Sequence, residues 1–212
     1  IIEFHYAKII QDELHYDSIY HEHLFYFTIK TLTNLCEKYN LHAYDVDKSP
    51  ISGGSLVLYF SKKKLKQKKK LIDLVNEEHK KKVNDFKTWK NFAKRSVNHS
   101  KKFKTIIQAL KKDNNLIGYG ASARSSTLLN FCGINNKILD KIIDKNKLKK
   151  NQYTPGSNIK IIDYDEIIKK VSNFKLIVVL AWNFKSEIVR DLKKNGFKGK
   201  FLLPLPNKIK IL

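Results

Sequence analysis

The stretch NLIGYGASARSSTLLNFCG, residues 115–133, decides how the second half of this chain is expected to fold. A short apolar run leads to two glycines and then to apolar residues at helical spacing, which predicts a strand followed directly by a helix. The same order recurs at NIKIIDYDEIIKKV (158–171) and where FKLIVVLAW (174–182) precedes SEIVRDLKKNG (186–196). This alternation predicts a parallel, doubly wound α/β sheet over residues 115–212.

The first half predicts a smaller α/β part over residues 1–61. Its expected elements are a strand at IIEFHY (1–6), a loop, a helix at TIKTLTNLCEKYN (28–40), and a strand pair at LHAYDV (41–46) and SLVLYF (55–60). Such a strand pair could close an α/β sheet. Residues 62–114 lack proline and glycine and carry apolar residues three or four apart, so we expect a helical connector there, in one or two pieces.

The charge of the chain is strongly positive, since 42 lysines and arginines against 20 acidic residues give a formal net charge of +22. This balance suggests nucleic acid as a partner, but only three of the cations are arginines, the residue that base readout and bidentate phosphate binding favour. Abundant lysine, asparagine and isoleucine indicate an A/T-rich genome instead. Nucleic-acid binding is therefore disfavoured.

No apolar run of about 18 residues and no apolar leader is present, so we expect neither a membrane span nor a signal peptide. Cys36 and Cys132 lie far apart on apolar faces of expected helices, which favours buried thiols in a reducing compartment over a disulfide or a metal site. A cytoplasmic protein is the expectation. The sequence contains no methionine, and we interpret it as a fragment.

The glycine-rich turn GYGASA, residues 118–123, could bind a phosphate at the helix N-terminus that follows it. Asp144 ends the next expected strand, where a dinucleotide-binding fold keeps an acid for the ribose. Trp182 and Asn183 follow the most apolar strand and suit a sugar or a base. A tight turn without ligand, a packing tryptophan and a helix-capping asparagine would explain the same residues.

The segment YHEHLFYF, residues 20–27, places titratable groups beside aromatic ones. His21 and His23 lack a clear third metal ligand nearby, so a metal site is not expected. A histidine beside a carboxylate in apolar surroundings is typical of a general base, because desolvation and the neighbouring charge shift its pKa in opposite directions. A purely structural role for these residues stays open.

Five stretches in order resemble the sugar C-methyltransferases, which use S-adenosylmethionine to methylate a carbon of a nucleotide-linked keto-sugar. They are DSIYHEHLFYF (17–27), SGGSLVLYF (52–60), GYGASARSSTLLNFCGI (118–134), IIDKNKLKKNQYTPGSNIKI (142–161) and VVLAWNFKSEI (178–188). The resemblance implies that residues 1–61 end a class I, Rossmann-like methyltransferase domain and that residues 115–212 form a second Rossmann-like domain after the connector. The glycine-rich S-adenosylmethionine loop and a zinc-binding module are expected upstream of residue 1.

Carried over to this sequence, the resemblance implies that His23 is the base that forms an enolate, with Glu22 and Tyr20 as neighbouring catalytic groups. The aromatic residues 25–27 are expected to wall a dry pocket. The residues expected to bind the nucleotide-linked keto-sugar are His21, Gly53, Gly54, Gly118, Tyr119, Gly120, Ala121, Arg124, Asp144, Trp182 and Asn183. The chain departs from the family pattern at Ser52, Ser122, Arg124, Ser125, Ser126 and Asn151, which stand in place of His, Pro, Lys, Gly, Asn and Gly.

Two alternatives predict different behaviour. A nicotinamide-dependent oxidoreductase or nucleotide-binding module built on GYGASA and Asp144 would bind NAD. A non-enzymatic, lysine-rich protein that binds RNA would show a steep salt dependence. The first alternative leaves YHEHLFYF unexplained, and the second explains none of the five stretches.

Overall fold

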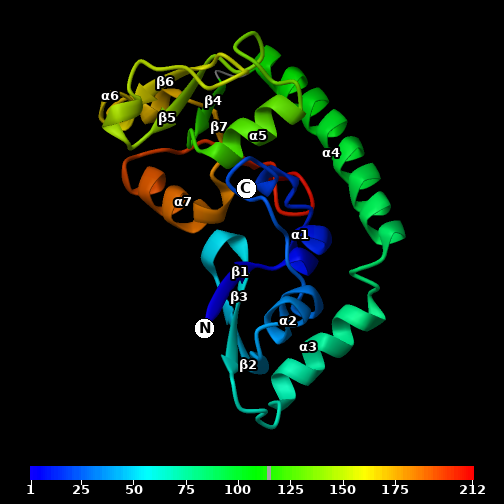
Figure 1. Cartoon of the computed structure of the whole chain (residues 1–212). Helices are drawn as coiled ribbons and strands as arrows, with labels where there is room; N and C mark the ends of the chain where they lie inside the picture. The colour runs from blue at the N-terminus through cyan, green and yellow to red at the C-terminus, as the bar shows by residue number, and fades with distance from the viewer. Residues whose placement is uncertain (114–115) are drawn as a thin grey trace. The chain divides into compact units, whose positions relative to one another are not determined.

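The computed structural model describes residues 1–113 and 116–212, and Figure 1 traces them by residue number. The chain divides into two compact units. The first unit contains Ile1–Leu14 and Glu22–Arg95, and the second contains His15–His21 and Ser96–Leu212.

The first unit has a three-stranded antiparallel sheet in the order β1-β3-β2. The strands are β1 (Ile2–His5), β2 (His42–Ser49) and β3 (Ser55–Ser61), and helices α2 (Ile29–Glu37) and α3 (Lys69–Lys80) accompany them. Leu32 and Cys36 of α2 and Leu71 of α3 share one apolar core with Leu56 and Leu58 of β3. The helix and strand pair predicted for residues 28–60 are thus confirmed.

The prediction of a loop after the first strand is wrong, because residues Ala7–Glu13 form helix α1 and Tyr16–Ser18 form the 3₁₀ turn η1. Ala7, Ile10 and Leu14 recur at helical spacing and are all buried. A helix of seven residues is too short to be stable by propensity alone, and tertiary contacts supply its stability.

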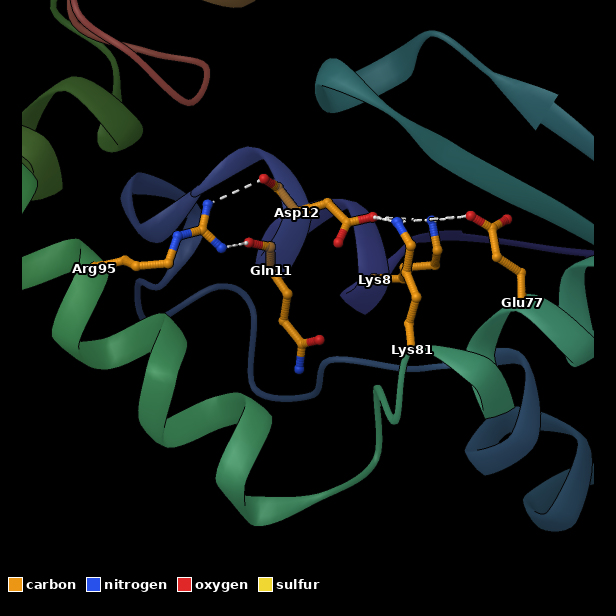
Figure 2. Close-up of polar contacts among 6 residues, drawn as sticks. All are labelled: Lys8, Gln11, Asp12, Glu77, Lys81 and Arg95. Carbon is orange, nitrogen blue, oxygen red and sulfur yellow. Dashed lines mark hydrogen bonds and ion pairs between the residues drawn. The ribbon is translucent and has the colours of Figure 1, made fainter.

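Figure 2 shows the polar contacts that hold α1. Lys8 pairs with Asp12 and with Glu77 of α3, each at 2.9 Å between nitrogen and oxygen, and Lys81 reaches Asp12 at 2.9 Å. Arg95 donates from Nη2 to the carbonyl oxygen of Asp12 and from Nη1 to that of the preceding residue, at 3.2 and 3.0 Å. Because the last carbonyls of a helix lack partners within it, this guanidinium acts as its C-terminal cap.

The predicted connector is helical and in two pieces, α3 and α4 (Phe86–Asp113), which Figure 1 draws one after the other. Leu71 packs α3 into the core of the first unit, and the division between the units falls at Arg95 and Ser96, inside α4. The predicted division into 1–61, 62–114 and 115–212 stays a prediction, and its second boundary lies outside the described residues.

The second unit has a six-stranded sheet in the order β6-β5-β4-β7-β8-β9. All neighbouring pairs are parallel except β8 with β9, which confirms the predicted parallel α/β sheet. The strands are β4 (Leu116–Tyr119), β5 (Lys141–Asp144), β6 (Lys160–Asp163), β7 (Leu176–Val179), β8 (Lys200–Leu203) and β9 (Lys210–Ile211), and the helices between them are α5 (Ala123–Phe131), α6 (Tyr164–Ile168) and α7 (Lys185–Lys194).

The core of this unit follows the two-residue period of the strands. Ile117 and Tyr119 of β4 and Ile177 and Val179 of β7 join one apolar cluster with Ile188 of α7. The short apolar runs read as strands are therefore buried, as parallel strands covered by helices must be. Among the helices of the described ranges, none is long and apolar enough to cross a membrane.

Candidate functional site

A hollow of about 270 Å³ opens beside the loops that follow β4, β5 and β7 in the second unit. The strand order reverses here, since β4 has β5 on one side and β7 on the other. Open α/β sheets bind ligands at such a switch point, at the carboxyl ends of the strands. Its lining combines apolar and aromatic side chains with a few charged ones: Tyr119, Gly120, Ser122, Asp144, Lys145, Ala181, Phe184, Glu187 and Ile188.

Two glycines of the predicted turn are required by packing. A Cβ atom at Gly118 would lie 2.9 Å from Ile142 Cγ1, and one at Gly120 would lie 2.5 Å from Ala181 Cβ. Gly120 also has φ of +95°, in the region that side chains disfavour. The glycine pattern therefore lets the β4–α5 loop approach β5 and the residues after β7, whether or not a ligand is bound.

Two amide groups of this loop, those of Gly120 and Ala121, already have partners within the protein. Gly120 donates to the carbonyl oxygen of Ile143 at 2.8 Å, and Ala121 donates to Asp144 Oδ2 at 2.8 Å. Lys149 Nζ in turn donates to the carbonyl oxygen of Ala121 at 2.7 Å. Because these two amides are bonded and the Asp144 carboxylate lies against the loop, this turn is poorly suited to bind a phosphate.

Arg124 and Trp182 donate hydrogen bonds to a buried aspartate, Asp17, and do not line the hollow. Arg124 donates from Nε and Nη2 to the two carboxylate oxygens of Asp17, each at 2.9 Å, and Trp182 Nε1 donates to Asp17 Oδ2 at 2.8 Å. The guanidinium carbon lies 4.8 Å from the centre of the tryptophan ring. Their predicted roles in substrate binding stay predictions, since their described contacts are to the protein.

The sequence analysis assigned no role to the segment His15–Ser18, which supplies this aspartate, although Asp17 and Ser18 begin the resembling stretch DSIYHEHLFYF. All four of its side chains are buried. The His15 ring lies 4.7 Å from the ring of Trp182, and the Ser18 hydroxyl donates to the carbonyl oxygen of His15 at 2.7 Å. Four polar or amphipathic residues in a row resemble an exposed turn, so no periodicity could have revealed their burial.

A second missed group is His99 of α4. Its Nε2 lies 2.8 Å from the carbonyl oxygen of Pro204, which can only accept, so Nε2 is the donor and Nδ1 accepts from the Tyr16 hydroxyl at 2.9 Å. The Tyr16 hydroxyl also lies 3.4 Å from Cys132 Sγ. Burial lowers the pKa of His99, and it raises the pKa of Tyr16 and that of Cys132, the latter to about 11. The three side chains therefore form a neutral network that holds η1 within the second unit.

The predicted catalytic segment crosses the division between the units along the chain. Tyr20 and His21 belong to the second unit, where their ring centres lie 6.0 Å apart. Glu22 and His23 belong to the first, where the His23 ring lies 6.4 Å from that of His5. His21 and Glu22 are exposed and His23 is half-buried.

The expectation that residues 25–27 wall a dry pocket concerns the complete enzyme and stays a prediction. Phe25 is 73% exposed and the preceding Leu24 is 75% exposed. The Phe25 ring stacks on Phe27 at 6.0 Å, and Phe27 packs on the core of the first unit. The Phe27 end of the aromatic run is therefore anchored within the first unit.

Gly53 and Gly54 form the turn before β3, with φ of +85° and +140°. The positive φ of Gly54 favours glycine, and a Cβ atom there would also lie 2.8 Å from Ile9 Cδ1, so the protein fold explains this glycine without a ligand. Asn151, which replaces a family glycine, keeps a left-handed φ of +62°, which asparagine tolerates. Ser125 replaces another within α5, so neither loss distorts the local backbone.

Asn183 is half-buried within the 3₁₀ turn η5 (Trp182–Phe184) and does not cap α7, whose N-cap is Phe184. Both cysteines are free and buried, as predicted. Within residues 1–113 and 116–212, no group of three or more histidine, cysteine or acidic side chains is placed to hold a metal ion.

Two comparisons bear on this arrangement. The family described as "C-methyltransferase C-terminal domain" matches residues 50–206. The chain is also 27% identical over 197 residues to C-methyltransferase NovU of Streptomyces niveus, and this alignment covers 90% of the chain and 46% of that protein. The chain thus spans about half the length of this relative.

Proposed function

This chain belongs to the C-methyltransferase C-terminal domain family, and from that membership we propose that it is the carboxyl-terminal part of an S-adenosylmethionine-dependent enzyme that methylates a carbon of a nucleotide-linked keto-sugar. The observation that carries the proposal is the family match over most of the chain. The parallel sheet with its switch-point hollow supports it, because this is where such folds bind nucleotides.

The β4–α5 loop does not fit the main binding loop for S-adenosylmethionine. The amides of Gly120 and Ala121 are bonded within the protein, and Asp144 faces that loop. We therefore expect the main cofactor loop in a methyltransferase domain that residues 1–61 would end, and zinc in a further module upstream of residue 1. The strand order β1-β3-β2, with β3 antiparallel to both neighbours, fits strands that close a larger sheet.

We assign to this chain the proton transfer that precedes methylation. A carbon beside a ketone becomes nucleophilic when it loses a proton, and a neutral imidazole takes up a proton near pH 7. His23 is the proposed base and Glu22 orients its ring. Tyr20 donates a hydrogen bond to the developing enolate oxygen, which stabilises the charge that forms there.

The switch-point hollow is the proposed site for the nucleotide-linked sugar. Tyr119, Phe184 and Ile188 offer apolar surfaces to a ring, and Asp144 and Lys145 supply polar groups of both signs. Lys145 already pairs with Asp191 at 2.9 Å, so a diphosphate would compete with that carboxylate. We expect no nucleic-acid partner, and the free, buried cysteines agree with the proposed cytoplasmic location.

The oxidoreductase alternative gains no support from the geometry. Dinucleotide binding needs free amides in the glycine-rich turn, and those of Gly120 and Ala121 are bonded within the protein. Saturable NAD binding by the second unit, without methyl transfer by the complete protein, would nevertheless favour that alternative.

The test uses the complete protein with methyl-labelled S-adenosylmethionine and a panel of nucleotide-linked keto-sugars. Label on a sugar carbon supports the proposal, and no transfer to any of them contradicts it. His23→Ala should also slow exchange of the substrate's α-proton with solvent by roughly 10²- to 10⁴-fold, the usual contribution of a general base. The exposed His79 provides a matched control, since His79→Ala should leave exchange unchanged, and equal exchange in both variants would dismiss His23 as the base.

A further inference from the structure

Asp17 receives three hydrogen bonds from two elements of the second unit that lie far from it in sequence. Both of its oxygens accept from the Arg124 guanidinium, and Oδ2 also accepts from Trp182 Nε1. The carboxylate is 1% exposed. Two parallel bonds between a guanidinium and a carboxylate fix the relative orientation of both planar groups, which a lysine or a single bond would not do.

The neighbours of Asp17 are held as well. The Tyr16 hydroxyl bonds to His99, and the Ile19 amide donates to the carbonyl oxygen of Tyr16 at 3.2 Å. Burial ends abruptly here, since Ser18 is buried whereas Ile19 is exposed. Tyr20 and His21 follow within four residues of the aspartate, on a stretch without helix or strand.

A buried carboxylate is a poor means of adding stability. Its desolvation offsets much of the attraction to its partner, and apolar residues of similar volume often stabilise a fold as well or better. What the pair does supply is one fixed arrangement of η1 against α5 and η5. The residues that benefit most from a fixed arrangement are those just beyond it, which the proposed function makes catalytic.

We propose that Asp17 is a positioning residue: through Arg124 and Trp182 it fixes the start of the segment that places Tyr20 against the substrate. The proposal rests on the proposed function, because a positioning role requires Tyr20 to act on the reacting atoms. The proposal thus gives Arg124 and Trp182 the same positioning role as Asp17, and we call these three residues the anchor. The hollow described above involves neither of these side chains.

The test compares Asp17→Asn with the wild type in the complete protein, on the keto-sugar that the wild type methylates. A misplaced catalytic group typically costs about 10²-fold in rate, so kcat and the α-proton exchange rate should fall about 10- to 100-fold with KM for the sugar little changed. Arg124→Lys keeps the charge but not the bidentate geometry, so its kcat should lie between that of Asp17→Asn and that of the wild type.

Asp12→Asn is the matched control, since Asp12 is also ion-paired, to Lys8 and Lys81, and lies outside the site. It should lower stability slightly and leave kcat unchanged. Folded Asp17→Asn protein with wild-type kcat would overturn the proposal. If that variant does not fold, Trp182→Phe removes one bond to the aspartate and keeps the ring, and unchanged kcat in it would also overturn the proposal. A wild type that methylates none of the sugars would instead contradict the proposed function.

Discussion

Glu78 of α3 is expected to be the most sensitive carboxylate of the first unit, because it completes the N-terminus of α2. Its Oε1 and Oε2 accept from the amides of Ile29 and Lys30 at 2.6 and 3.2 Å. Thr28 and Thr31 satisfy each other's amides in a capping box. Together these four contacts provide a partner for each orphan amide of the first turn, and Glu78 itself is 2% exposed.

The perturbation is Glu78→Gln, which keeps the shape of the side chain, removes its charge and turns one acceptor into a donor. One buried amide then lacks an acceptor, which costs about 1–3 kcal/mol. Loss of the negative charge at the helix N-terminus adds up to about 2 kcal/mol. We therefore expect the free energy of local unfolding of α2 to fall by about 1 to 5 kcal/mol.

The matched control is Glu77→Gln on the same helix. Glu77 is 41% exposed and pairs with Lys8 and Lys81, so its removal should cost about 0–1 kcal/mol. Hydrogen exchange of peptides over Ile29–Glu37 in the complete protein reads the local change without assuming two-state unfolding. A loss of 2 kcal/mol corresponds to roughly 30-fold faster exchange. Equal exchange in the two variants would refute the capping argument.

Two further predictions concern the second unit. Gly120→Ala should destabilise β4 and β7 by about 1–3 kcal/mol more than Gly196→Ala does. Both glycines have positive φ, but a methyl group at Gly120 would meet Ala181, whereas one at Gly196 has no atom within 4 Å. Hydrogen exchange of the strand peptides measures the difference. His99 is held neutral by burial, with a pKa below its ordinary value near 6.5, so the stabilisation from burying it neutral is complete above pH 6.5 and is lost as pH falls towards the folded-state pKa. Denaturant midpoints between pH 7 and 5 should therefore fall less in His99→Gln than in the wild type, and parallel curves would contradict the assignment.

The alternation of strands and helices in the second unit was predictable because each signal is local. A parallel strand covered on both faces is apolar throughout, as Leu176–Val179 is, and its helix carries its own period. Helix α1 was not predictable in this way. It has seven residues, and its stabilising partners Glu77, Lys81 and Arg95 lie about seventy or more positions further along the chain.

In the candidate site, too, contacts between residues far apart in the sequence were not predictable. The sequence correctly indicated that the GYGASA turn and Asp144 lie together at a strand edge, because the βα rhythm places strand ends on one side of a sheet. It did not indicate that Arg124 and Trp182 bond to a residue 107 and 165 positions away. Position in a motif says which residues are neighbours along the chain, and the partner of each side chain depends on the tertiary fold.

Two of the three loops beside the hollow also hold Asp17. The loop after β4 contributes Gly120 to the hollow and leads into Arg124 on Asp17, and η5 contributes Phe184 to the hollow and Trp182 to Asp17. On the roles proposed for the hollow and for Tyr20, a substitution in either loop is expected to alter sugar binding and the placement of Tyr20 together. Asp17 bonds to Arg124 and Trp182 but does not line the hollow, so its substitution separates the two effects. A fall in kcat at unchanged KM indicates a defect in the positioning of Tyr20. A rise in KM alone indicates a defect in the hollow.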